Sequence, residues 1–211
     1  MQRIADSFSW PFRASALRWL PGMVCVLLLP LLFIPLLGYA VAATRAAAHD
    51  PPHAPPGWAP SVRLLTDGFW VAAAILLTAL PFAALFLPLA SALHGLGSAA
   101  GVVAFFVLAL PWGLLALLVL PHATARFAAG GEKRDLFDFS AAVRSVRREF
   151  ATWNLAVAAI VTAWAIGLAC VGLLCVGILP GAFYAILVSA HACAALSQAP
   201  GPRQGGDPSA R

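Results

Sequence analysis

The sequence predicts an all-α, polytopic membrane protein built as a helical bundle. Three stretches contain no Asp, Glu, Lys or Arg: residues 19–44, 68–125 and 150–202. The chain is 62% hydrophobic and 10% charged, whereas an average soluble domain is about 45–50% apolar and about 25% charged. A helix beside water needs a polar stripe, but a helix surrounded by hydrocarbon is apolar on all sides. We therefore expect four or five membrane spans in a single domain over residues 1–197.

The first apolar run, residues 20–43, leaves two paths open because it contains Pro30 and Pro35. If the run crosses once, there are five spans, and the three basic residues before it lie opposite the other ten. If it dips in and returns as a re-entrant, proline-broken hairpin, all 13 basic residues share one face. The positive-inside bias favours the hairpin. The backbone of a returning loop disfavours it, since its polar groups need partners from other helices.

The two later runs are each too long for one span of about 20 residues. The run over residues 68–125 contains glycines and small polar residues at 91–98, where we expect a turn. The last run divides similarly at residues 177–181, where two glycines flank a proline. The predicted spans are about residues 69–90, 99–120, 153–176 and 182–196.

A basic segment separates the two pairs of spans. Phe139, Val143, Val146 and Phe150 recur at helical spacing on one face, while the flank and back carry Arg144, Arg147 and Arg148. This pattern is typical of an amphipathic helix, here residues 139–150, that lies on the membrane surface. Asp138 or Ser140 is positioned to cap its first turn.

Charge also predicts orientation and partners. Positive-inside counting puts the surface helix and the carboxyl terminus in the cytoplasm of a multi-pass protein of the cell (inner or plasma) membrane. We expect the bilayer, through its anionic headgroups, to be the partner of the basic cluster, and we expect no nucleic-acid binding. The Gly- and Pro-rich residues 198–211 are predicted to be a disordered cytoplasmic tail.

Short landmarks over most of the chain resemble domain-of-unknown-function family 4013. They are Trp10-Pro11-Phe12, Gly38-Tyr39, Pro56-Gly57-Trp58, Asp67-Gly68, Ala125-Arg126-Phe127, Phe137-Asp138-Phe139 and Val188-Ser189-Ala190-His191. Many members have an acidic residue where this chain has Gly57. The resemblance implies a prokaryotic multi-pass membrane protein, and it supplies no catalytic residue because the family has no known activity.

The predicted spans contain few polar groups that could serve chemistry. His191 is the clearest ionisable residue among them, and an intramembrane ionisable group is a functional candidate by default. The sequence favours a packed structural role, in which one interhelical hydrogen bond holds a neutral imidazole, because the spans contain no Asp or Glu partner for a proton relay. Asn154, Thr162 and Trp164 add polarity to the neighbouring span, so these four residues form the candidate intramembrane polar site.

A stripe of small residues follows the last span. Gly181, Ala185, Ser189 and Cys193 repeat every four residues, and the preceding span offers a matching patch at Ala163 and Gly167. Small residues at this spacing let two helix backbones approach closely in lipid. We predict a helix-packing stripe, either within the chain or between two copies.

The sequence contains no motif for a metal, cofactor or catalytic site. It has no H-E-x-x-H, no G-x-S-x-G, no phosphate-binding glycine loop and no acidic pair within a span. We expect a non-enzymatic scaffold or accessory subunit that forms homo-oligomers or binds a membrane protein partner. The alternative is a carrier or pore for an apolar or weakly polar solute or lipid, which predicts a cavity lined by the polar site.

Overall fold

The computed structural model describes residues 2–49, 54–130, 132–172 and 177–197, and every regular element in these ranges is helical. The α-helices are α1 (Gln2–Ala5), α2 (Leu20–Leu27), α3 (Leu29–His49), α4 (Val62–Ala92), α5 (Ala100–Gly130), α6 (Phe139–Arg148), α7 (Phe150–Ala169) and α8 (Ile178–Ser197). Among the described residues, five helices are long and apolar enough to cross a membrane. The predicted fold class is confirmed. The tail predicted over residues 198–211 lies outside the described residues.

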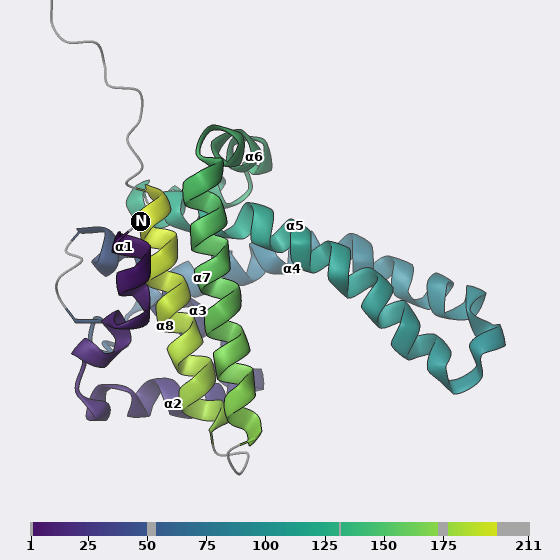
Figure 1. Ribbon diagram of the computed structural model, residues 1–211, viewed down its shortest axis with the longest axis horizontal. Helices are drawn as coiled ribbons and strands as arrows, with labels where there is room; N and C mark the ends of the chain where they lie inside the picture. Colours follow the sequence, from purple (N-terminus) through teal and green to yellow (C-terminus); the bar gives the residue numbers. More distant parts are fainter. Residues whose placement is uncertain (1, 50–53, 131, 173–176, 198–211) are drawn as a thin grey trace, which may run out of the picture.

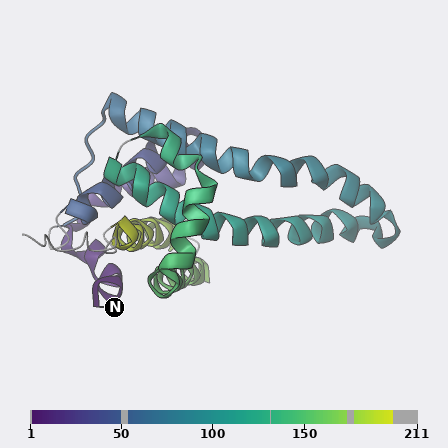
Figure 2. The same cartoon turned by 90° about the horizontal axis from the view of Figure 1, so that it is seen from above.

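The body of the molecule is built around α8. Helices α7 and α8 lie side by side and run in opposite directions, and α3 crosses α8 on its other side (Figures 1 and 2). Each of the two paired helices has 20 residues, which corresponds to about 30 Å and matches the hydrocarbon core of a bilayer. These two helices therefore have the length of ordinary spans.

The amino-terminal segment runs along α8 in the opposite direction. Ile4 packs in one cluster with Leu196, near the carboxyl end of α8. Further along, the hydroxyl of Tyr184 donates to the carbonyl of Phe8 at 3.2 Å. Short 3-10 turns, η1 (Asp6–Phe8), η2 (Trp10–Arg13) and η3 (Ala16–Arg18), pair part of the segment's backbone internally.

The helix of the first apolar run is interrupted shortly before each of its two prolines, Pro30 and Pro35. Its backbone leaves helical geometry at Leu28 (φ −98°, ψ 32°) and again at Leu32 (φ −108°, ψ 18°), while Pro35 lies inside α3. A proline lacks an N–H and its ring crowds the carbonyl four residues earlier, so the distortion appears one turn before it. The result is a short α2 followed by α3, whose residues Leu31–His49 form one of the five candidate spans.

Helices α4 and α5 are longer than the predicted spans and form a projecting hairpin, the α4–α5 arm (Figures 1 and 2). Helix α4 begins at Val62 because the Ser61 hydroxyl caps it by accepting from the N–H of Leu64 at 3.2 Å. The turn between them, η4 (His94–Ala99), contains Gly97 at φ 57°. The charge-free part of each helix is about 25 residues and about 38 Å long, so it fits a core of about 30 Å when tilted by about 40°.

Two further predicted boundaries differ from the structure. The surface helix α6 ends at Arg148, because Glu149 leaves helical geometry (φ −125°, ψ 39°), so Phe150 begins α7 and does not belong to the α6 face. Helix α8 begins at Ile178, and Gly181 therefore lies inside it and not in the turn. Residues 173–176, predicted to end the preceding span, lie outside the described residues.

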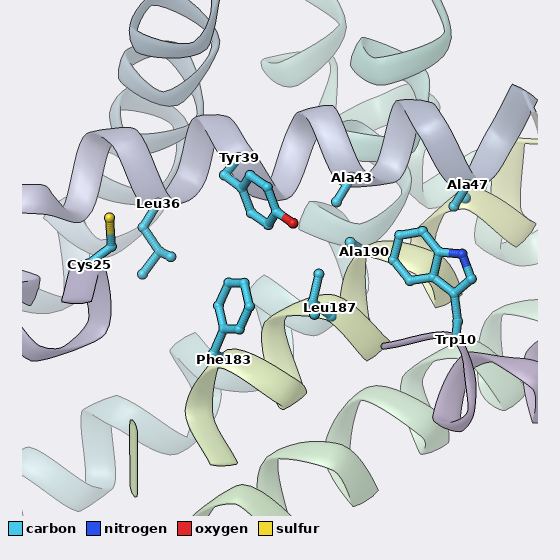
Figure 3. Close-up of a cluster of buried hydrophobic side chains, with 10 residues drawn as sticks. Trp10, Cys25, Leu36, Tyr39, Ala43, Ala47, Phe183, Leu187 and Ala190 are labelled. Atoms are coloured by element: carbon cyan, nitrogen blue, oxygen red, sulfur yellow. The ribbon is translucent and has the colours of Figure 1, made fainter. Parts of the chain in front are cut away.

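The largest core cluster lies between α3 and α8. Figure 3 shows Tyr39 facing Phe183, with Trp10 near Ala47. The Tyr39 ring stacks on Trp58 at 4.2 Å with an interplanar angle of 2°, and its hydroxyl donates to the carbonyl of Pro56 at 3.0 Å. These contacts hold the loop before α4 against the body.

Candidate functional site

The structure places His191 in a buried contact with the amino-terminal segment. Its Nδ1 lies 2.8 Å from the hydroxyl of Ser7, and its ring lies 5.1 Å from that of Trp10. His191 is 3% exposed and Ser7 is fully buried. The two residues are 184 positions apart, and a serine in a polar segment carries no periodic signal, so sequence reasoning missed Ser7.

The predicted four-residue polar site does not assemble. Asn154 and Thr162 are exposed on α7, and Trp164 is 40% exposed. The buried face of α7 contains Ala156, Ala159, Ile160, Ala163 and Gly167. Asn154 lies about 200° around the helix from the first of these residues. The prediction that these side chains gather around His191 is therefore wrong.

The predicted small-residue stripe lies where α7 meets α8, a contact that we call the α7–α8 seam. A Cβ added to Gly167 would lie 2.7 Å from the carbonyl oxygen of Gly181, and a Cβ on Gly181 would lie 2.7 Å from that of Gly167. Ala163 and Ala185 beside them are fully buried. Further along α8, the Ser189 hydroxyl donates to the carbonyl of Ala185 at 2.7 Å.

A second close approach, between α3 and α4, was not predicted. A Cβ on Gly38 would collide with the backbone carbonyl of Leu64, and one on Gly68 would collide with that of Ile34. Small residues four apart do occur on both helices, at Gly38, Ala42 and Ala46 of α3 and at Gly68 and Ala72 of α4, but this spacing does not show which helix each one packs against. Only the crossing itself brings the two glycines to one place.

Ion pairs join the helices where their apolar stretches end. Arg45 of α3 contacts the carboxylate of Asp67 of α4 at 3.1 Å, and its Nε donates to the carbonyl of Ala128 of α5 at 3.2 Å. The Asp67 side chain is 13% exposed. One arginine thus connects three helices.

The basic cluster Arg144, Arg147 and Arg148 is exposed on α6. The helix begins at the cap Asp138, whose carboxylate accepts from the N–H of Ala141 at 2.9 Å. This hydrogen bond, followed by one from Ser140, holds the pKa of Asp138 below its ordinary value. The cluster is therefore attached to a helix with a fixed start.

Two apolar grooves open on the surface of the helices. The central groove, about 410 Å³, lies among α3, α4, α5, α7 and α8, and Trp164, Ser189 and Cys193 are among its lining residues. Three residues with hydroxyl groups line the groove, Thr44, Thr124 and Ser189, and the hydroxyls of Thr44 and Ser189 donate to carbonyls of their own helices at 2.9 and 2.7 Å. The groove therefore presents an apolar lining that suits hydrocarbon.

The arm groove, about 420 Å³, lies between the two helices of the α4–α5 arm. Its lining combines alanines with aromatic side chains: Ala79, Phe82, Ala83, Phe86, Phe105, Leu108, Ala109 and Trp112. Helices α4 and α5 thus leave space between them away from the body. Within the described ranges, no three His, Cys, Asp or Glu side chains gather as metal ligands would.

One comparison with known proteins gives a match. A family model described as "Protein of unknown function (DUF4013)" matches residues 22–176. No curated protein and no solved structure matches the chain.

Proposed function

The chain belongs to the DUF4013 family of proteins of unknown function, and we propose that it is a non-enzymatic membrane scaffold whose α4–α5 arm packs against other membrane helices. The observation that carries this proposal is the surface of the arm. Eight large side chains on α4 and α5 are between 57% and 72% exposed: Leu76, Leu80, Leu87, Val102, Phe105, Phe106, Leu110 and Leu114. The arm extends beyond the body (Figure 1), so these side chains are available to lipid or to another protein.

The arm groove favours a protein helix as the occupant. Alanines in its lining allow a backbone to approach, and the aromatic residues beside them offer large contact areas. Packing of this kind drives helix association in lipid, where the hydrophobic effect between helices is absent. The occupant is then either a second copy of this chain or a helix of another membrane protein.

Photocrosslinking in native membranes tests the scaffold. A photoreactive amino acid at Phe86, in the arm groove, is expected to give a protein adduct. The matched control at Val161, 49% exposed on α7, is expected to give lipid adducts alone. An adduct of twice the chain mass of 22.0 kDa identifies a second copy, and another mass identifies a different partner. Lipid adducts alone at both positions would contradict the proposal.

The absence of catalysis is part of the proposal. Ser7 and His191 are in hydrogen-bonding distance, as a nucleophile and its base are in hydrolases, but both are buried and neither lines the central groove or the arm groove. We expect a serine-reactive fluorophosphonate probe to leave the protein unlabelled. Labelling that disappears in a Ser7→Ala variant would instead indicate a serine hydrolase.

The proposed orientation puts α6 and the carboxyl terminus on the cytoplasmic side of the cell membrane. The exposed bases of α6 support it, because basic residues stay on that side and attract anionic headgroups. Single cysteines at Ser140 on α6 and Ser98 at the arm tip, in a chain whose four native cysteines are replaced, can be compared with a membrane-impermeant maleimide. We expect Ser140 to react only in inside-out vesicles and Ser98 only in right-side-out vesicles. The reverse pattern would overturn the orientation.

A second function, carriage of an apolar solute or lipid, is favoured by the central groove. Its volume of about 410 Å³ and its apolar lining suit an acyl chain. A lipid-transfer assay in liposomes tests it, with Ala40→Phe as the variant that fills the groove. If this variant transfers lipid more slowly than the wild type, the carrier is favoured over the scaffold. If the wild type transfers no lipid, the carrier function is excluded.

A further inference from the structure

A polar cavity of about 290 Å³ lies where α5, α6 and α8 meet. Its polar lining consists of His122, Arg126, Asp135, Ser145, Glu149 and Ser197. The apolar stretches of α5 and α8 end at this level and that of α7 begins here, so all three helices reach it (Figure 1). In a bilayer, this is the depth of the lipid headgroups.

Two nitrogen atoms in the cavity lack hydrogen-bond partners. His122 is 3% exposed, and its Nε2 has no partner among the described residues. The Nη1 of Arg126 is also buried without a hydrogen bond, although the carboxylate of Asp138 lies 3.8 Å away. The other end of that guanidinium donates to Asp135 at 2.8 Å. Burying a polar group without a partner is unfavourable, so a bound group that accepts hydrogen bonds would satisfy the Nη1–H of Arg126 and, in the tautomer with the proton on Nε2, the imidazole of His122.

The cavity also contains a carboxylate without a close cation. Within the described residues, Asp135 is paired with Arg126, whereas Glu149 has no basic side chain in ion-pairing distance. Arg148 acts on Glu149 only through its longer-range field, and burial raises the pKa of Glu149. The hydroxyl of Ser197 donates to the carbonyl of Ala194 at 2.8 Å, which leaves its oxygen free to accept. The cavity therefore contains donors, at His122 and Arg126, and acceptors, at Glu149 and Ser197.

We propose that this cavity binds a phosphoethanolamine group, in which a phosphodiester stands beside a primary ammonium. Phosphate oxygens accept hydrogen bonds from Arg126 Nη1 and His122 Nε2, and the ammonium donates to Glu149 and Ser197. The cavity lies below the size of about 300–1,000 Å³ that holds a whole drug-sized ligand. It suits a headgroup whose tails remain outside. The same group occurs as a lipid headgroup and as a soluble phosphodiester, so the experiment has an arm for each.

Competition among three lipids tests whether the cavity recognises the phosphoethanolamine group. The purified full chain in mild detergent is given equimolar phosphatidylethanolamine, phosphatidylcholine and phosphatidylglycerol with identical tails, and native mass spectrometry measures the retained lipids. We expect phosphatidylethanolamine to exceed each competitor about tenfold, since a hydrogen bond to a charged group is worth roughly that factor. Choline lacks N–H donors and glycerol lacks the cation, so the two competitors separate these contributions.

Two variants test whether the preference for phosphatidylethanolamine arises in this cavity. Glu149→Gln removes the acceptor charge, and Glu149 makes no side-chain cap hydrogen bond to α7, so the helix keeps its start. We expect this variant to retain the three lipids about equally. Glu132→Gln, at a carboxylate that is 56% exposed and outside the cavity, is expected to retain the wild-type preference.

The second arm identifies the source of the group. Thermal unfolding of lipid-free protein is measured with glycerophosphoethanolamine and with phosphatidylethanolamine. Stabilisation by the lipid alone assigns the cavity to a membrane headgroup, and equal stabilisation by both assigns it to the soluble molecule. Equal retention of all three lipids by the wild type, which needs no variant, overturns the proposal, as does a preference that survives Glu149→Gln.

Discussion

Replacing Gly167 by alanine tests how closely α7 and α8 must approach. The new Cβ would lie 2.7 Å from the Gly181 carbonyl oxygen, whereas ordinary contact begins at 3.4 Å. The two backbones must therefore separate by about 0.7 Å. A gap of this size costs the flanking buried alanines about a quarter to a half of their dispersion energy. From the usual cost of overpacking, we expect the free energy of unfolding to fall by about 2 kcal/mol.

The assay is reversible unfolding in mixed micelles by added dodecyl sulfate, followed by tryptophan fluorescence and far-ultraviolet circular dichroism. Gly113→Ala is the matched control, because a Cβ on Gly113 has no atom within 4 Å. Alanine favours a helix over glycine by up to about 1 kcal/mol, so the control should be neutral or slightly more stable. If both variants behave alike, close backbone approach does not determine how α7 and α8 pack.

The remaining predictions concern polar contacts. Arg45→Gln leaves the 13%-exposed Asp67 carboxylate without its 3.1 Å partner and should lower the free energy of unfolding by about 2 kcal/mol in the same assay; a neutral result would mean that the ion pair contributes nothing. Ser7→Ala removes the 2.8 Å contact with His191 and should cost about 1 kcal/mol, and a gain in stability would refute this. The lowered pKa of Asp138 means that its ionised form stabilises the start of α6 above the ordinary value of 3.8, and that this contribution is lost as the pH falls through the lower folded-state pKa. The stability difference between wild type and Asp138→Asn should therefore be constant near neutral pH and shrink in acid, and a difference that grows in acid would contradict the cap.

The membrane class was predictable because hydrocarbon constrains composition directly. Every residue that faces lipid must be apolar, so runs without charge appear in the sequence itself. Helix α6 was predictable for a related reason: its basic side chains are exposed and its apolar face is buried, and both faces show in its periodicity. Local spacing also indicated the glycine and alanine positions of the α7–α8 seam, since small residues four apart share one helix face.

The sequences of the long helices do not predict which face of each helix is packed against its neighbours. A helix that is apolar all round has no polar side to show which face is packed, so Asn154 and Thr162 could not be placed on the exposed face of α7 in advance. The partners in several contacts are also far apart in the chain. Ser7 meets His191, and Gly38 of α3 meets α4 at Leu64, and no local pattern relates such residues.

The sequence by itself determined the medium, the helical class and the basic surface helix, because each follows from the affinity of single side chains for water or hydrocarbon. Only the tertiary structure decided that the α4–α5 arm leaves the body, that the amino-terminal segment lies along α8, and that His122, Arg126 and Glu149 line one cavity. The physical reason is that close packing between apolar helices depends on the matching of two surfaces. A single helix carries only half of that information.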